Sequence, residues 1–102
     1  MTVIVKQFPN SFVQTDLDDR LKGASAHHLV LAGFMTHMWI DSTARGAFNL
    51  DYSPTVVANA TATRALPGTT AVVSPAGLQA ASLGALGDLF AIVVPDGAAI
   101  PD

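Results

Sequence analysis

Four short apolar segments recur along the chain, and turn residues separate them. They are Thr2 to Val5, Leu29 to Ala32, Thr55 to Ala58 and Phe90 to Val94. Short runs rich in aliphatic residues predict β-strands. The second run does not alternate with polar residues, which is typical of a strand covered on both faces in a parallel sheet.

The segments between these strands have the features of helices. Thr15 or Asp16 can cap a short helix, and Gly23 is predicted to end it in the left-handed conformation. Thr36 is predicted to begin a second helix that runs to about Asn49, because apolar residues recur there at helical spacing.

Ser74 and Pro75 predict the start of a third helix, since serine is a favoured cap and proline fits the first turn. Residues 59–73 before it read as a polar connection that contains proline and glycine. Strands and helices therefore alternate, which implies right-handed crossovers and a parallel sheet. The sequence predicts an α/β fold, a parallel β-sheet with flanking helices, in one domain over residues 1–102.

The composition is unusually apolar for so short a chain. Half of the 102 residues are hydrophobic and only 13% are charged, whereas about 25% is usual for soluble domains. A small domain has much surface to cover, so we expect an exposed apolar patch, and such patches mark interfaces. The patch indicates a homo-oligomer or a complementary chain.

Charge and cysteine usage exclude several classes of function. The net charge is −3 and the basic residues are scattered, so no stripe is available for nucleic acid. The chain contains no cysteine, which excludes disulfides, thiolate metal sites and a cysteine nucleophile. The apolar runs are too short to span a bilayer and the start does not resemble a signal peptide, so we expect a cytoplasmic protein without a membrane partner.

One stretch resembles the signature of a known family. Residues 30–39 read VLAGFMTHMW. In isochorismatase-like cysteine hydrolases, a strand ends in Ala-Gly or Val-Gly, a threonine follows after two variable residues, and the nucleophilic cysteine stands three residues later. The helix that follows carries Thr-Ala-Arg-x-Ala, which matches Thr43 to Ala47, and Lys6 with the loop from Asn10 to Leu17 resembles the family's lysine segment.

The resemblance implies a truncated isochorismatase-like fold, a Rossmann-like three-layer arrangement. The chain starts at what looks like the third strand of the family, so the strand that carries the catalytic aspartate is expected to be missing. Residues that bind metal in some members would lie in the same missing half. We therefore expect neither a metal nor a cofactor.

The resemblance also assigns site residues. Trp39 stands at the nucleophile position, and Lys6 is the vestigial electrostatic partner of that position. The backbone amides of Met35 and Trp39 correspond to the donors of the oxyanion hole. A cis peptide bond is expected between Phe34 and Met35.

Several positions depart from the family pattern. Trp39 replaces the cysteine. Its indole group is a hydrogen-bond donor without a useful nucleophilic atom, and it is larger than a thiol. Asn59 replaces a usual aspartate, and Asp51 stands where a glycine commonly ends the helix. Ser42 and Thr36 are the neighbouring hydroxyls, but neither has an obvious base beside it.

Other polar residues have simple structural interpretations. His27 and His28 are expected in a surface turn rather than as metal ligands, because neighbours on an extended chain face opposite ways. His37 is expected to be structural, although it is close enough to the elbow to line a pocket. Capping and the helix dipole explain the acidic cluster. That cluster consists of Asp16, Asp18 and Asp19.

Two hypotheses of function follow. The first is a degenerate hydrolase fold that is catalytically inactive and self-associates, with Trp39 as a core or interface plug and Lys6 as a solvated lysine at a strand end. The second is a subunit of a cysteine hydrolase of amidase or isochorismatase type, in which a second chain completes the site and Lys6 remains a functional cation.

Overall fold

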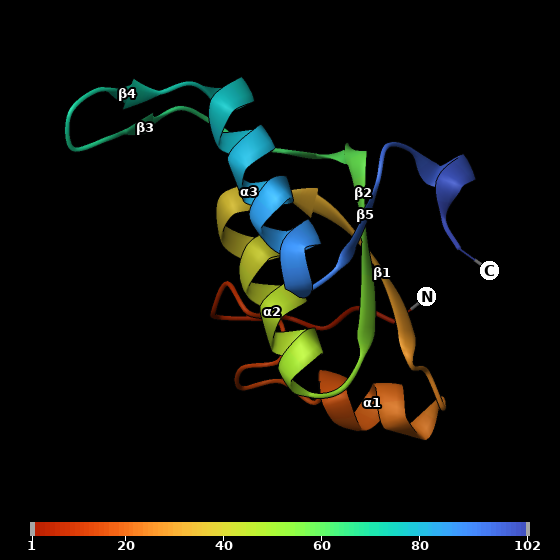
Figure 1. Cartoon of the computed structure of the whole chain (residues 1–102). Coiled ribbons are helices and arrows are strands. Elements are labelled where there is room, and N and C mark those ends of the chain that lie inside the picture. Colours follow the sequence, from red (N-terminus) through yellow and green to blue (C-terminus); the bar gives the residue numbers. More distant parts are fainter. Residues whose placement is uncertain (1, 102) are drawn as a thin grey trace.

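The computed structural model describes residues 2–101 and has a parallel sheet at its centre. The sheet contains β1 (His28–Phe34), β2 (Ser53–Ala62) and β5 (Ile92–Val94), in the order β1-β2-β5. β2 pairs in parallel with both neighbours, as Figure 1 shows. The predicted α/β fold with a parallel sheet is thus confirmed.

Two helices cover one face of this sheet (Figure 1). They are α2 (Asp41–Asn49) and α3 (Pro75–Leu89). The core between the helices and the sheet is formed by Ile40, Ala44, Val56 and Leu86. As predicted, Ser74 caps α3, and its Oγ accepts a hydrogen bond of 3.0 Å from the amide of Gly77.

The other face of the sheet is partly bare. Val30 and Ile92 lie in register on either side of Thr55, and their side chains are 54% and 52% exposed. Burial along β1 alternates, so the expectation that this strand is covered on both faces is wrong for the described chain. The reason is physical: α2 and α3 pack on one face only.

The prediction of a first strand over Thr2 to Val5 is also wrong. These residues are extended coil with exposed valines, because a β-branched segment this short needs a neighbouring strand to pair with. α1 (Leu17–Gly23) forms where predicted, at the amino ends of the strands (Figure 1). Gly23 does not take the left-handed conformation; Ser25 does so two residues later, with φ of 56°.

The polar connection over residues 59–73 is more regular than predicted. β2 continues to Ala62, and β3 (Leu66–Pro67) pairs antiparallel with β4 (Val72–Val73) in a small hairpin. This hairpin projects from the body of the molecule in Figure 1. A short 3₁₀ turn, η2 (Gly97–Ala99), follows β5. Within residues 2–101, no helix has the length and apolar character needed to cross a membrane.

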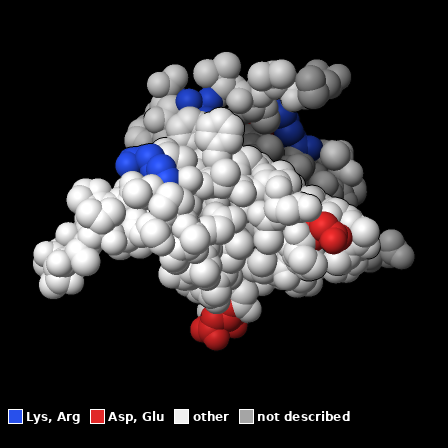
Figure 2. Space-filling model, turned by 90° about the horizontal axis from the view of Figure 1, so that it is seen from above, with Lys and Arg blue, Asp and Glu red and all other residues white. Residues whose placement is uncertain are grey.

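Much of the surface is uncharged, as the composition predicts. Figure 2 looks at the molecule from above and shows a few separated basic and acidic groups on an otherwise uncharged face. Large apolar side chains are exposed at several places in the described chain, including Phe34 of β1 and Val72 of the hairpin.

Candidate active site at the elbow after β1

A sharp elbow joins β1 to the next helix. The peptide bond between Phe34 and Met35 is cis, as the resemblance implied. Gly33 has a φ of +129°, a conformation that a side chain would disfavour. A single π-helical turn, η1 (Thr36–Ile40), then leads directly into α2.

Trp39 lies within this turn and lines the space beside the elbow. Its side chain is 44% exposed, so it is neither a fully buried core residue nor directed entirely into water. The Nζ atom of Lys6 lies 4.4 Å from the centre of the indole ring, which is a cation–π contact. Lys6 and residue 39 are 33 positions apart in sequence, yet the fold brings them together as the resemblance predicts.

Lys6 is held by two further contacts. Its Nζ donates hydrogen bonds to the carbonyl of Pro9, at 3.0 Å, and to Oγ of Ser11, at 2.9 Å. The side chain is half-buried and lies in coil rather than at the end of a strand. Desolvation lowers the pKa of the Lys6 ammonium below its usual 10.5.

Thr43 of α2 anchors this lysine loop to the helix. Its Oγ1 accepts a hydrogen bond of 3.0 Å from the amide of Ser11 and donates one of 3.2 Å to the carbonyl of Pro9. The hydroxyls of Ser11 and Thr43 are also 3.0 Å apart. Because Thr43 is only 8% exposed, these bonds fix the loop against α2 in a partly dry environment.

Two cavities open beside the elbow, and Lys6, Ser11 and Trp39 line both. The first has a volume of about 460 Å³. Its other walls are Thr2, Ile4 and Leu17. The second has about 300 Å³ and is bounded by residues 31–34, Ile40 and Thr43. Neither wall carries a carboxylate, so the ammonium of Lys6 is the only charge that faces these cavities from the described residues.

The amide of Trp39 already has a partner in the turn. It donates to the carbonyl of Met35 at 3.0 Å, and the amides of Met38 and Ile40 reach the same carbonyl at 3.1 and 3.4 Å. An oxyanion role for the amides of Met35 and Trp39 therefore stays a prediction.

Comparison with known proteins agrees with this geometry. The profile of the isochorismatase domain matches residues 1–95. This chain belongs to the isochorismatase family. The isochorismatase family protein YddQ of Bacillus subtilis is 40% identical over 92 residues, which cover 90% of this chain and 51% of YddQ.

Two further relatives extend the comparison. The crystal structure of an isochorismatase from Pseudomonas putida superimposes with a TM-score of 0.92 and 34% identity, covering 96% of this chain and 50% of that one. The ureidoacrylate amidohydrolase RutB of Serratia proteamaculans is 39% identical over 59 residues, or 58% of this chain and 24% of RutB. The chain thus spans about half the length of YddQ and of the Pseudomonas protein.

The other polar residues considered in the sequence lie outside the elbow cavities. His37 Nδ1 is hydrogen-bonded to the hydroxyl of Thr63, which supports a structural role. His27 and His28 contact each other edge to face, and no cluster of metal-ligating side chains forms among residues 2–101. Asp51 has a φ of 73°, so it occupies the left-handed position where the family commonly has glycine.

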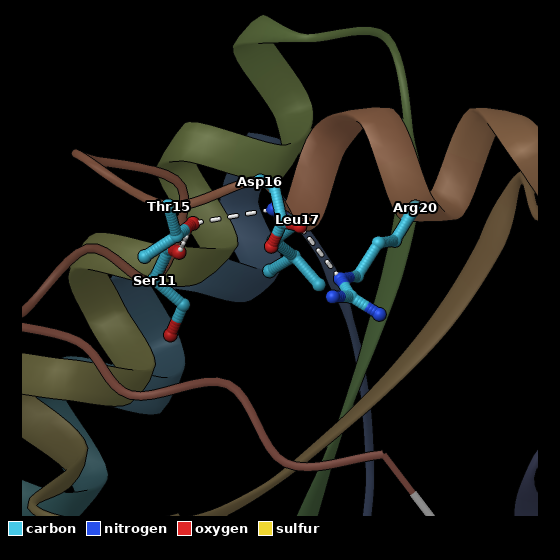
Figure 3. A network of polar contacts seen from close by, with 5 residues as sticks. All are labelled: Ser11, Thr15, Asp16, Leu17 and Arg20. Atoms are coloured by element: carbon cyan, nitrogen blue, oxygen red, sulfur yellow. Dashed lines mark hydrogen bonds and ion pairs between the residues drawn. The ribbon is translucent and has the colours of Figure 1, made fainter.

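Two residues of the acidic cluster, Asp16 and Asp18, pair with basic side chains, and the predicted cap by Asp16 is wrong. Asp18 and Asp19 lie in the first turn of α1, as the helix-dipole interpretation requires. Asp16 makes no side-chain cap of α1. Its carboxylate instead forms an ion pair with Nε of Arg20 at 2.8 Å. The hydroxyl oxygen of Thr15 accepts a hydrogen bond from the backbone amide of Leu17, as Figure 3 shows. Thr15 in turn donates to the carbonyl of Ser11, at 2.6 Å, which links α1 to the lysine loop.

Sequence reasoning missed Ser11 and Thr43 as members of the site. Both stand inside segments that resemble the isochorismatase pattern, but their side chains meet only through the tertiary fold. The five-residue spacing from Lys6 to Ser11, with Pro9 between them, was the available signal, since proline turns the chain back on itself. Of the hydroxyls considered instead, Thr36 is fully buried and Ser42 lines neither elbow cavity.

Proposed function

We propose that this chain is a member of the isochorismatase family that does not carry out thiol-dependent hydrolysis and that assembles with itself. The observation that carries the first part is the indole of Trp39 against the Lys6 ammonium, 4.4 Å from ring centre to Nζ, in a chain without cysteine. Thiol hydrolysis needs a thiolate at this point, and indole offers no equivalent atom.

The bare face of the sheet supports self-association. Val30, Phe34 and Ile92 expose apolar surface on β1 and β5, and β1 is an edge strand without a charged residue. Edge strands of monomers usually carry charge or proline, which prevents pairing with another chain. A twofold dimer through this face is the simplest arrangement, because twofold symmetry is the commonest in homo-oligomers.

Turnover and oligomeric state test this proposal directly. The purified chain is incubated with isochorismate and with ureidoacrylate, and we expect no product. Sizing chromatography is expected to give a dimer or larger species. Substitution of Val30 by Asp should shift the protein toward the monomer. Product formation by the unaltered chain, or a monomer at all concentrations, would overturn the corresponding part of the proposal.

The identity of position 39 has its own test. Trp39→Cys should give a thiol that reacts faster with iodoacetamide than the thiol of a matched control, Ser42→Cys, three residues further along. The Lys6 ammonium beside position 39 stabilises a thiolate there, while Ser42 lies outside the elbow cavities. Equal reactivity would contradict the assignment of position 39 to the nucleophile.

A second candidate is an enzyme subunit completed by another chain. The observation that favours it is Lys6, a desolvated cation without a carboxylate on the cavity walls. The half of YddQ that this chain does not match is a suitable probe, since the match covers 51% of that protein. Binding of this half, with blue-shifted emission from Trp39 and turnover only after Trp39→Cys, supports this candidate over self-association.

A further inference from the structure

Ser11 has a base candidate within hydrogen-bonding distance. Nζ of Lys6 lies 2.9 Å from Ser11 Oγ, and both side chains line the two elbow cavities. A serine hydroxyl becomes nucleophilic when a neighbouring base removes its proton, and lysine serves as that base in one variant of the catalytic triad. The hydroxyl is half-buried and still reachable from the cavities.

The surroundings of Lys6 favour its neutral amine more than those of an ordinary surface lysine. The ion pairs in the described chain use Arg20, Lys22 and Arg45, so none involves Lys6. The cavity walls contributed by the N-terminal coil, α1, β1, η1 and α2 carry no other titratable side chain. Partial burial lowers the pKa of the half-buried Lys6, and a lysine with a lowered pKa is better suited to act as a base than a fully solvated one.

We propose that Ser11 is a nucleophile with Lys6 as its base, and that it accepts acyl groups from activated aryl esters that enter the cavity beside Trp39. In the structure Nζ of Lys6 donates to both the Pro9 carbonyl and Ser11 Oγ. The neutral amine keeps one N–H on Pro9 and turns its lone pair to Ser11, whose hydroxyl then donates to Nζ instead of to Oγ1 of Thr43. Trp39 supplies an aromatic surface against which the aryl group packs.

The step balances without any further reagent. Ser11 Oγ forms a bond to the acyl carbon while its proton passes to Nζ of Lys6, and the ester C–O bond breaks. The aryl group leaves as a phenolate, and the Lys6 ammonium loses its proton to solvent water, which restores the neutral amine. Water, deprotonated by the same amine, then cleaves the acyl-serine to a carboxylic acid and restores the hydroxyl.

The substrate class follows from the backbone amides next to Ser11. The amide of Ser11 donates to Thr43 Oγ1, and the amide of Phe12 donates to Oδ1 of Asn10 at 2.9 Å. With both amides engaged, the tetrahedral oxyanion receives little stabilisation from them. Esters whose leaving group is already stable, such as aryl esters, are therefore the expected substrates, and amides are not.

This inference goes beyond the proposed function, which concerns thiol chemistry at position 39. The test uses 4-nitrophenyl acetate with the unaltered chain, followed by intact mass measurement and peptide mapping. We expect one acetyl group on Ser11 and a rate that rises with pH to a plateau below 10.5, the usual pKa of lysine. Acetylation of the Lys6 amine or of another residue, with Ser11 unmodified, would overturn the inference.

Variants separate the base from a merely structural lysine. Ser11→Ala should abolish this acetylation, and Lys6→Met should slow it by about 100-fold and remove the plateau in the pH profile. Ser42→Ala, on α2 outside both cavities, should react like the unaltered chain. An unchanged pH profile in folded Lys6→Met would overturn the role of Lys6. Turnover of isochorismate or ureidoacrylate would instead contradict only the proposed function.

Discussion

The basic side chains at the two ends of the parallel sheet have different partners. At the amino end, α1 pairs each cation with a carboxylate four residues earlier: Arg20 with Asp16 at 2.8 Å, and Lys22 with Asp18 at 3.0 Å. At the carboxyl end, Lys6 faces an indole ring, a carbonyl and a hydroxyl, and no carboxylate lines its cavities. Charge pairs on an exposed helix contribute little to stability, whereas a partly desolvated cation without a carboxylate partner marks a candidate functional site.

Alkaline pH should separate the two ends, because their pKa shifts have opposite consequences. At the amino end, a hydrogen bond to Asp18 raises the pKa of Tyr52 to about 12. This contribution to stability is present below 10.0 and is lost between 10.0 and about 12. At the carboxyl end, burial lowers the pKa of Lys6. The unfolded chain then holds more protons between the lowered value and 10.5, so stability rises with pH in that window.

The largest effect is expected at the carboxyl end from Thr43→Val. Valine keeps the shape of threonine but leaves the Ser11 amide without its acceptor and the lysine loop without its anchor. We expect the free energy of unfolding to fall by about 2 kcal/mol, measured by urea denaturation. Thr43→Ser, which retains the hydroxyl, is the matched control. Equal losses in the two variants would show that packing, rather than hydrogen bonding, fixes the loop.

Local patterns predicted the helices and the parallel strands, while contacts between distant segments decided the rest. Ser74 followed by proline is a local signal, and α3 begins there. Thr2 to Val5 has the composition of a strand, but a strand also needs a partner, which no local pattern reports. The alternating burial of β1 likewise depends on which face α2 and α3 cover.

Only those features of the candidate site that belong to the family pattern could be predicted from the sequence. The resemblance placed Lys6 beside position 39 and placed the cis bond after Phe34, and the structure has both features. It did not reveal the hydrogen bonds that join Lys6, Ser11 and Thr43, because those depend on how the lysine loop packs on α2.

A smaller and more local effect is expected at the amino end from Asp18→Asn. Removing the carboxylate removes the main cause of the raised pKa of Tyr52, which should move from about 12 toward 10.0. Tyr52 is the only tyrosine, so ultraviolet absorbance of the phenolate reports this titration directly. Asp19→Asn is the control and should shift the pKa less, since Asp19 is the weakest of the causes. Equal shifts would indicate a general charge effect in place of a specific hydrogen bond.

The smallest change in stability at neutral pH is expected from Lys6→Met. The informative result is whether the stability difference between the unaltered chain and this variant rises or falls at high pH. The variant loses a cation–π contact and two hydrogen bonds but no longer has to desolvate an ammonium group, so the net change should be about 1 kcal/mol or less. Between neutral pH and pH 10.5, the unaltered chain should gain stability relative to Lys6→Met, and any loss from Tyr52 cancels because both proteins share it. A relative loss would mean that Trp39 and Pro9 stabilise Lys6 as a cation, which would remove the physical basis for a base at the elbow.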